Sequence, residues 1–145
     1  MAMGSPGPAT PGTDTLEAAE ARLSDRSLSA RQAGAAGEEL AAVWLRTRGW
    51  RIVDRNWRSR YGELDIVALD PEGTLAFVEV KTRRSVRFGP PQCAVTHAKR
   101  TNLRRAGVQW LLDHRGLLHN GVRFDVLAVS VEAEGPRVEH LRGAF

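Results

Sequence analysis

A short stretch of the chain, from Gly62 to Lys81, places an unusual amount of charge within two apolar runs, LDIVAL and LAFVEV. The turn-forming sequence DPEG separates these runs, which predicts a β-hairpin. Because side chains alternate along a strand, Glu63 and Asp65 share one face of the first run. Glu79 and Lys81 share one face of the second run in the same way. The chain must therefore accommodate three carboxylates and one lysine on a largely buried hairpin.

The register of this hairpin decides whether the charges meet. If residues 70–74 form the turn, Asp65 lies opposite Glu79. The same register places Glu63 opposite Lys81. Opposed residues have Cβ atoms about 4.5–5.5 Å apart, where two carboxylates repel unless a cation or a shared proton lies between them. A slip of one residue would place the two acids on opposite faces of the sheet.

The composition is compatible with one folded domain and excludes several kinds of protein. A chain of 145 residues needs neither a disulfide nor a structural metal to fold. The single cysteine, Cys93, allows no internal disulfide, which favours a cytoplasmic location. No apolar run approaches the ~20 residues of a membrane span, and the N-terminus lacks the pattern of a secretory signal, so we expect no membrane partner. The net charge of +4 is compatible with a polyanionic partner.

The hydrophobic patterns predict a single α/β domain after an N-terminal tail. Residues 1–27 are predicted to be mostly disordered, although Thr15 could cap a short transient helix over residues 15–23. The domain is predicted to occupy residues 28–145, with helices at 29–48 and 96–115 and strands at 50–58, 64–69, 75–80 and 122–131, to which residues 137–141 could add a short edge strand. This αβββαβ order predicts a mixed central sheet that is flanked by helices.

The opposed acids of the hairpin suit a divalent metal ion. Mg²⁺ and Mn²⁺ prefer oxygen ligands, commonly one or two carboxylates together with water and phosphate oxygens. Asp65 and Glu79 could supply the two carboxylates. Lys81 could orient an attacking water and neutralise charge on a phosphate in the transition state. The alternative is a solvated strand face with a cross-strand ion pair, but the apolar flanks and the basic loop that follows Lys81 favour a site.

Two further acids have roles that the pattern leaves open. Glu38 falls on the apolar stripe of the first long helix, so its carboxylate is expected to lie against other protein. There it could complete the metal site, or it could be a rim glutamate that is paired with a nearby arginine. Asp125 is a lone acid in an apolar strand, for which a structural hydrogen-bonding role is favoured over a role in the site.

Basic residues follow Lys81 and occupy the second long helix, largely off its apolar stripe. They are candidates for contacts with the phosphates of a nucleic acid, which position the nucleic acid without reading its base sequence. The alternative is a solvated basic helix face. The residues are Arg83, Arg84, Arg87, Lys99, Arg100, Arg104 and Arg105.

The order of these motifs resembles a known group of nucleases. A helical Glu38, followed by GELD at 62–65 and VEVK at 78–81, is similar to the PD-(D/E)XK superfamily, in particular its Holliday-junction resolvase-like branch. The fuller pattern is closer to the YraN-like family of predicted endonucleases, and the resemblance covers about residues 37–145. The segments that carry it include GEELAAVWLRTRGWRIVDRNWR, YGELDIVALD and FVEVKTRRSVRFGPP.

This resemblance implies a restriction-endonuclease-like fold and a particular set of site residues. It makes Asp65, Glu79 and Glu38 the ligands of Mg²⁺ or Mn²⁺, and Lys81 the catalytic lysine. Glu63 has no fixed role in the superfamily. It is therefore a candidate to support the site from behind or to pair with Lys81.

The resemblance also implies an activity and partners. The expected activity is metal-dependent hydrolysis of phosphodiesters in DNA, with branched or flapped DNA among the candidate substrates. Resolvase relatives act as dimers, so a homodimer is one expectation for this chain. The alternative function is a non-catalytic nucleic-acid-binding or adaptor protein that retains the nuclease fold.

Overall fold

The computed structural model describes residues 15–84 and 95–145, which form three helices and five strands. The candidate residue Arg87 and the single cysteine, Cys93, lie outside the described residues. None of the helices in the described part of the chain has the length and apolar content that a membrane crossing requires. The helices are α1 (Leu16–Leu23), α2 (Ala30–Thr47) and α3 (His97–Asp113), and the strands are β1 (Arg51–Ser59), β2 (Gly62–Leu69), β3 (Leu75–Arg83), β4 (Val122–Glu132) and β5 (Gly135–Leu141).

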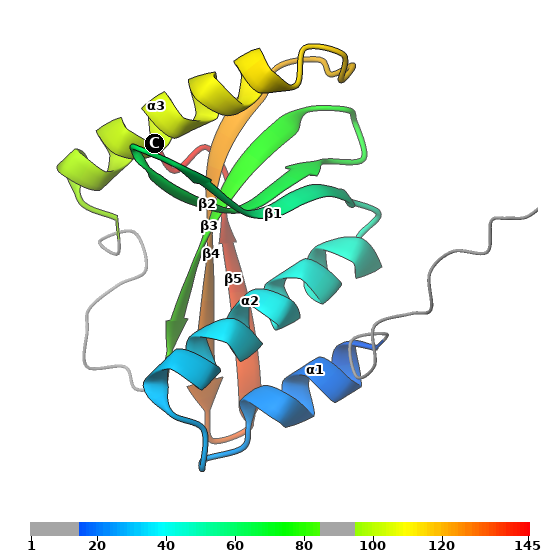
Figure 1. Ribbon diagram of the computed structural model, residues 1–145. Coiled ribbons are helices and arrows are strands. Elements are labelled where there is room, and N and C mark those ends of the chain that lie inside the picture. The colour runs from blue at the N-terminus through cyan, green and yellow to red at the C-terminus, as the bar shows by residue number, and fades with distance from the viewer. Residues whose placement is uncertain (1–14, 85–94) are drawn as a thin grey trace, which may run out of the picture.

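The strands form one mixed sheet in the order β1-β2-β3-β4-β5. β3 and β4 are parallel and are connected through α3, whereas the other neighbouring strands are antiparallel. The helices α1 and α2 cover one face of the sheet, and α3 covers the other (Figure 1). The predicted α/β class and the mixed sheet flanked by helices are therefore confirmed, and the architecture is consistent with a restriction-endonuclease-like fold.

The first helix lies in the stretch that we predicted to be a mostly disordered tail. The hydroxyl of Thr15 accepts a hydrogen bond from the N–H of Ala18 at 3.0 Å, which is the predicted cap. Ala19 and Leu23 are buried and belong to the same apolar cluster as α2. The packed part of the chain therefore includes α1, which precedes residue 28, because a helix this short is stable only when it packs on other elements.

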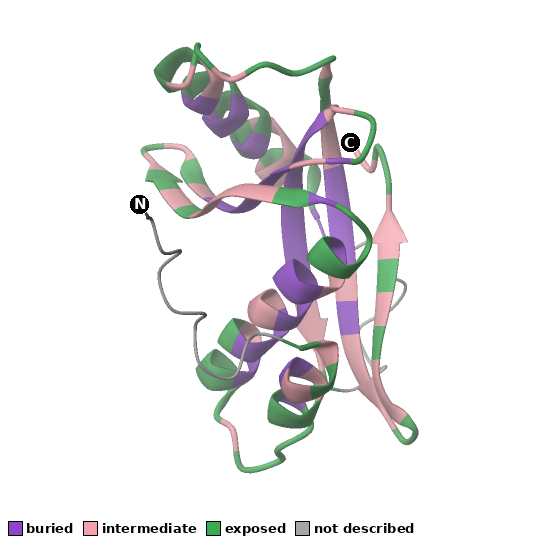
Figure 2. Cartoon of the chain, turned by 90° about the vertical axis from the view of Figure 1, so that its right-hand side faces the viewer, coloured by how far each residue is buried: buried purple, intermediate pink, exposed green. Residues whose placement is uncertain are grey.

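The core has two layers, one on each face of the sheet. Along β3, Ala76 and Val78 pack beneath α2. Leu75 and Phe77 alternate with them and pack beneath α3. Figure 2 shows buried residues along the central strands and on the helix surfaces that face them. The next residue on the α3 face is Glu79, so a carboxylate continues an otherwise apolar row.

Gly37 allows α2 to approach β3 closely. A methyl group on Gly37 would overlap the hydroxyl group of Thr82 in β3 and would lie 2.9 Å from its Cβ. At Gly34, in the preceding turn of α2, a methyl group would have nothing within 4 Å. Gly37 therefore sets how near its neighbour Glu38 comes to the strand that carries Glu79.

Replacing Gly37 by alanine is expected to lower the free energy of unfolding by about 1–3 kcal/mol, because overpacking forces α2 away from β3. The matched variant Gly34→Ala should instead raise it by up to about 1 kcal/mol, because alanine favours the helix. Urea denaturation of both variants measures the difference. Equal effects of the two substitutions would contradict the close approach at Gly37.

Candidate active site

β2 and β3 separate at the position of the two predicted acids. The ladder between these strands begins at Leu69 and Leu75, in the predicted register, and ends at Ile66 and Val78. Beyond that pair, β2 continues with β1, and β3 continues with β4 through residues 79–83. We call this divergence the strand fork, formed by residues 62–65 of β2 and residues 79–83 of β3. A fork leaves backbone groups without strand partners, and polar side chains can take the place of the missing partners.

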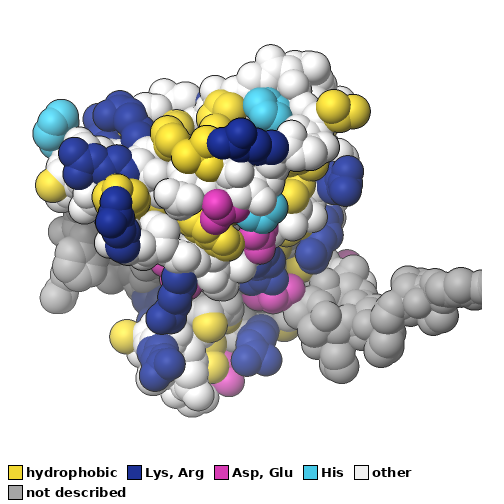
Figure 3. Space-filling model, turned by 45° about the horizontal axis from the view of Figure 1, so that its top comes forward, with side chains coloured by type: hydrophobic (Ala, Val, Ile, Leu, Met, Phe, Trp, Pro, Cys, Tyr) yellow, Lys and Arg dark blue, Asp and Glu magenta, His cyan; other side chains and the backbone are white. Residues whose placement is uncertain are grey.

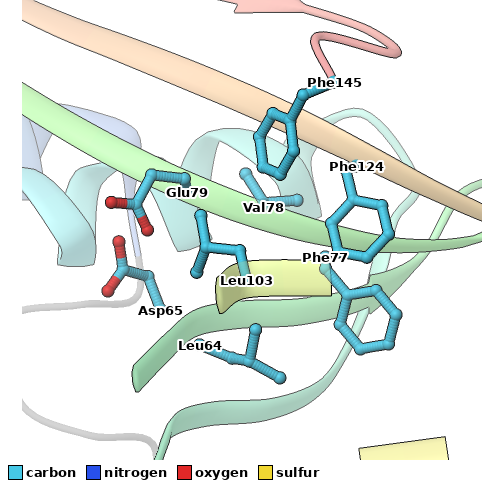
Figure 4. Close-up of a pocket in the computed structure, with 8 residues that line it drawn as sticks. All are labelled: Leu64, Asp65, Phe77, Val78, Glu79, Leu103, Phe124 and Phe145. Carbon is cyan, nitrogen blue, oxygen red and sulfur yellow. The ribbon is translucent and has the colours of Figure 1, made fainter. Parts of the chain in front are cut away.

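Asp65 and Glu79 are the first residues of the strand fork and point toward each other (Figure 4). An oxygen of Asp65 (Oδ2) accepts a hydrogen bond from the N–H of Val80 at 2.9 Å. The carboxylate therefore replaces a ladder hydrogen bond that the diverging strand no longer supplies. Burial, followed by the charge of Glu79, raises the pKa of Asp65 to about 8. Without a cation beside it, Asp65 therefore holds a proton near neutral pH.

Two lysines contact Glu79, whose side chain is only 5% exposed. The Nζ atom of Lys81 lies 3.5 Å from Oε2 of Glu79. The Nζ atom of Lys99, from the first turn of α3, lies 2.5 Å from the same oxygen. Burial and the neighbouring Lys99 lower the pKa of Lys81. Burial opposes the charge on Lys99 as well, but its contact with Glu79 outweighs this and raises the pKa of Lys99.

Glu38 reaches toward the strand fork from α2. It is half-buried, and the amide Nδ2 of Asn56 donates a hydrogen bond to it at 3.3 Å. Burial, followed by the charge of Glu63, raises the pKa of Glu38, and the charge of Glu79 contributes in the same direction. Three acids from separate elements therefore influence one another across the fork. Asn56 has a left-handed φ of 52°, a conformation that asparagine tolerates better than most residues.

Among residues 15–84 and 95–145, two pairings considered for these acids are not made. The arginine contact considered for Glu38 is made by its neighbour Glu39, which lies 2.9 Å from Arg55. Glu63 pairs at 3.5 Å with Arg58 on the adjacent strand, and not with Lys81. The strand fork explains the second difference, because the ladder ends before Glu63 and Lys81 could face each other. The charge of Glu63 contributes to the site by raising the pKa of Glu38.

The buried floor of the strand fork is apolar. It encloses a cavity of about 10 Å³, the space of one water molecule. A floor of this kind excludes bulk water, which explains why burial is the main cause of the raised pKa of Asp65. Figure 4 shows the residues that line the cavity together with Asp65 and Glu79, namely Leu64, Phe77, Val78, Leu103, Phe124 and Phe145.

The donor chemistry of the site fits a divalent cation that also uses water and phosphate oxygens. Asp65 and Glu79 supply two facing carboxylates, which is the usual number of protein ligands for Mg²⁺. Within residues 15–84 and 95–145, no three acidic, histidine or cysteine side chains converge closely enough to hold a metal ion by themselves. Glu38 therefore lies near Asp65 and Glu79 but does not form a three-carboxylate metal site with them.

The predicted basic residues have different surroundings. A guanidinium nitrogen of Arg84 donates to the carbonyl of Leu28 at 2.7 Å, and the Nε of Arg100 donates to the carbonyl of Val95 at 3.2 Å. Arg104 and Arg105 are exposed on α3, whereas Arg83 is half-buried and Arg84 exposed at the end of β3. Figure 3 shows Lys and Arg side chains over the surface around α3, interspersed with apolar ones.

Lys99 was predicted as a phosphate contact, and in the structure its Nζ atom contacts Glu79. The hydroxyl of Thr96 caps α3 by accepting from the N–H of Lys99 at 3.2 Å, which places Lys99 in the first turn. It lies one turn before Leu103, so it continues the buried side of α3 rather than lying off it. That spacing was the signal in the sequence for a lysine that reaches the site.

Asp125 has the structural role that its sequence context favoured. It is fully buried in β4, where Arg123 donates to both of its oxygens at 2.9 and 3.1 Å. The Nε2 of His140 lies 2.8 Å away, and the N–H of Gly143 donates at 2.9 Å. Although burial opposes it, the hydrogen bonds from His140 and Arg123 lower the pKa of Asp125.

A mixed five-stranded sheet with helices on both faces, and a buried pair of acids beside lysines at a strand fork, define a protein of the restriction-endonuclease-like fold class. The profile of the uncharacterised protein family UPF0102 matches residues 37–129. The chain belongs to this family, which is the YraN-like family that its motifs resemble.

Relatives of similar length support this membership. The chain is 52% identical over 124 residues to a UPF0102 protein of Bifidobacterium longum (strain NCC 2705), covering 85% of this chain and 100% of that protein. It is 50% identical over 113 residues to a UPF0102 protein of Rhodococcus jostii (strain RHA1), covering 77% and 94%. A UPF0102 protein of Geobacter sulfurreducens is 48% identical over 113 residues, covering 77% and 87%.

Proposed function

We propose that the protein is a metal-dependent nuclease-like enzyme that hydrolyses phosphodiester bonds in DNA, with branched or flapped DNA among its candidate substrates. The observation that carries the proposal is a pair of buried acids, Asp65 and Glu79, that face each other across the strand fork. Lys81 contacts Glu79. Burying two like charges side by side costs free energy, so such a pair is retained where a cation or a reaction requires it. Membership of UPF0102 establishes the family and leaves the activity to experiment.

The residues of the strand fork have separable roles in this proposal. Asp65 and Glu79 would hold Mg²⁺ or Mn²⁺, and Glu38 would orient water from the side of α2. When bound, a divalent cation neutralises charge that develops on the phosphate. The lowered pKa of Lys81 suits its Nζ atom to accept a proton from the attacking water. The apolar floor excludes competing water from the site.

The basic residues around the fork would bind the DNA backbone. Arg104 and Arg105 are exposed on α3, the helix whose first turn carries Lys99. Contacts of this kind are electrostatic, so DNA affinity should fall steeply as salt concentration rises. Arg83 and Arg84 extend the basic surface from the end of β3.

Replacing Lys81 by methionine is expected to lower cleavage by roughly 10²–10³-fold, because the site loses its proton acceptor and a charge beside the phosphate. DNA binding should change little. The assay compares branched, flapped and linear DNA with Mg²⁺ or Mn²⁺, using Arg137→Met, at an exposed position of the edge strand β5, as the control that keeps full activity. Cleavage that persists in Lys81→Met would trace to a contaminating nuclease and remove the support for the proposal.

A second candidate function is a non-catalytic nucleic-acid-binding or adaptor protein. The observation that favours it is that Lys81 and Lys99 already neutralise Glu79 without a metal ion. Salt-sensitive DNA binding that is unaffected by Mg²⁺ or Mn²⁺, with no cleavage of any of the three DNA forms, would establish this function instead.

A further inference from the structure

Lys99 contacts Glu79 more closely than the expected catalytic lysine does. Its Nζ atom lies 2.5 Å from Oε2 of Glu79, whereas that of Lys81 lies 3.5 Å from the same oxygen. The two lysines come from different elements, since Lys81 is in β3 and Lys99 is in α3. One carboxylate oxygen therefore receives two ammonium groups.

A divalent cation between Asp65 and Glu79 would compete with Lys99 for that oxygen. The Glu79 side chain is only 5% exposed, so water screens the charges around it weakly. An ammonium group and a metal ion repel each other at such a position. The contact between Lys99 and Glu79 and the binding of a cation are therefore mutually opposed.

The side chain of Lys99 has room to move away from Glu79. Its side chain is 42% exposed, and a lysine has a flexible four-carbon stem with three donors on its ammonium group. The side chain of Lys81, at 30% exposed, has less freedom. On release, the Lys99 ammonium group would point toward solvent along the same helix that exposes Arg104 and Arg105.

We propose that Lys99 is the resident counter-ion of Glu79, which a divalent cation displaces and which then binds a phosphate of the DNA. This inference rests on the proposed function and adds a coupling between its two ligands. The cation releases a positive charge for the DNA, and DNA that holds Lys99 away from Glu79 makes cation binding easier. Coupling of this kind is reciprocal, so each ligand strengthens binding of the other by the same factor.

The test measures the affinity of the full chain for Mn²⁺ alone, by calorimetry or by the electron paramagnetic resonance of free Mn²⁺. Lys99→Met is expected to bind Mn²⁺ about tenfold more tightly than wild type, because the competing charge is gone and couplings of this size are common between neighbouring sites. Lys99→Arg should bind Mn²⁺ as wild type does. Arg115→Met, which removes a charge just beyond the other end of α3, controls for the change in net charge.

A second measurement follows the coupling itself. Ca²⁺ replaces Mn²⁺ to prevent cleavage, and the probe is a short fluorescein-labelled DNA duplex. Ca²⁺ should strengthen DNA binding by wild type and have a several-fold smaller effect on Lys99→Met. Thermal unfolding establishes that each variant is folded, as expected for substitutions at the partly exposed Lys99 and the exposed Arg115.

Two outcomes would overturn this inference and leave the proposed function intact. Weaker Mn²⁺ binding by Lys99→Met would show that Lys99 only holds Glu79 in place. Equal Mn²⁺ affinities of wild type and Lys99→Met would show that no competition exists. If neither protein bound Mn²⁺, or if Asp65→Asn bound it as well as wild type, the proposed function would fail together with the inference.

Discussion

Asparagine in place of Asp65 should abolish metal-dependent cleavage and, at the same time, stabilise the metal-free protein. The loss of a carboxylate ligand is expected to lower cleavage by roughly 10³-fold. The amide of asparagine keeps an oxygen for the N–H of Val80 and carries no charge to repel Glu79. We therefore expect the free energy of unfolding at pH 8 and above to rise by about 1–3 kcal/mol.

The pH dependence of this effect has a definite sign. The pKa of Asp65 is raised in the folded protein from its ordinary value of 3.8 to about 8. The folded state therefore holds a proton that the unfolded state has lost, and the wild-type protein loses stability as the pH rises through this window. The gain in the free energy of unfolding of Asp65→Asn over wild type should be absent near pH 3.8 and complete above about pH 8.

Urea unfolding in the presence of a chelator, on the acidic side of this window and again above about pH 8, measures the prediction for Asp65. Asp113→Asn, which removes an exposed acid at the end of α3, is the control and should show no such pH dependence. Added Mn²⁺ should stabilise wild type and leave Asp65→Asn unchanged, because a ligand stabilises the state that binds it. If the gain in the free energy of unfolding of Asp65→Asn became smaller as the pH rose, this would contradict the raised pKa of Asp65.

Alanine in place of Asp125 should have the largest effect on stability, lowering the free energy of unfolding by about 3–5 kcal/mol. The substitution leaves the ring of His140 without its buried partner. It also removes two acceptors from the guanidinium group of Arg123, which keeps only its contact with Asp70 among the buried acids of the described residues. It also leaves the N–H of Gly143 without its acceptor. A change of this size is a large part of the total stability of a small domain, which is about 5–15 kcal/mol.

The stability that Asp125 contributes should depend on pH in the opposite direction. Its pKa is lowered in the folded state, so its contribution is present above the ordinary value of 3.8 and is lost as the pH falls through the lowered value. Urea unfolding followed by circular dichroism measures the effect, with Asp125→Asn as a milder variant that keeps one acceptor. Lost activity at unchanged stability would show that Asp125 acts in the reaction rather than in the fold.

Much of the fold follows from local features of the sequence. The hydroxyl groups of Thr15, Ser29 and Thr96 cap the three helices of the described chain, and residues of this kind are favoured at such positions. The two-residue period of strands and the length of the turn after Leu69 set the hairpin register. Asp65 and Glu79 face each other for that reason, and every interaction involved lies within a few residues along the chain or across one hairpin.

Contacts between side chains of different helices and strands were decided only by the tertiary structure. The spacing to Leu103 puts Lys99 on the buried side of α3, but it does not give Glu79 as the partner, because that contact depends on α3 crossing between the parallel strands β3 and β4. A lysine at a helix start normally faces water, and its long stem hides how far the ammonium group can reach. Asn56 meets Glu38 through packing of the same kind, between β1 and α2.

The hairpin that carries Asp65 and Glu79 was therefore determined by the sequence alone, through alternation and a turn. The tertiary structure decided that the hairpin opens into a fork, and that Lys99 arrives there from another element. The physical reason is the range of the interactions. Strand register is a short-range property of the backbone. Neutralising two buried carboxylates instead requires charges that the whole fold brings together.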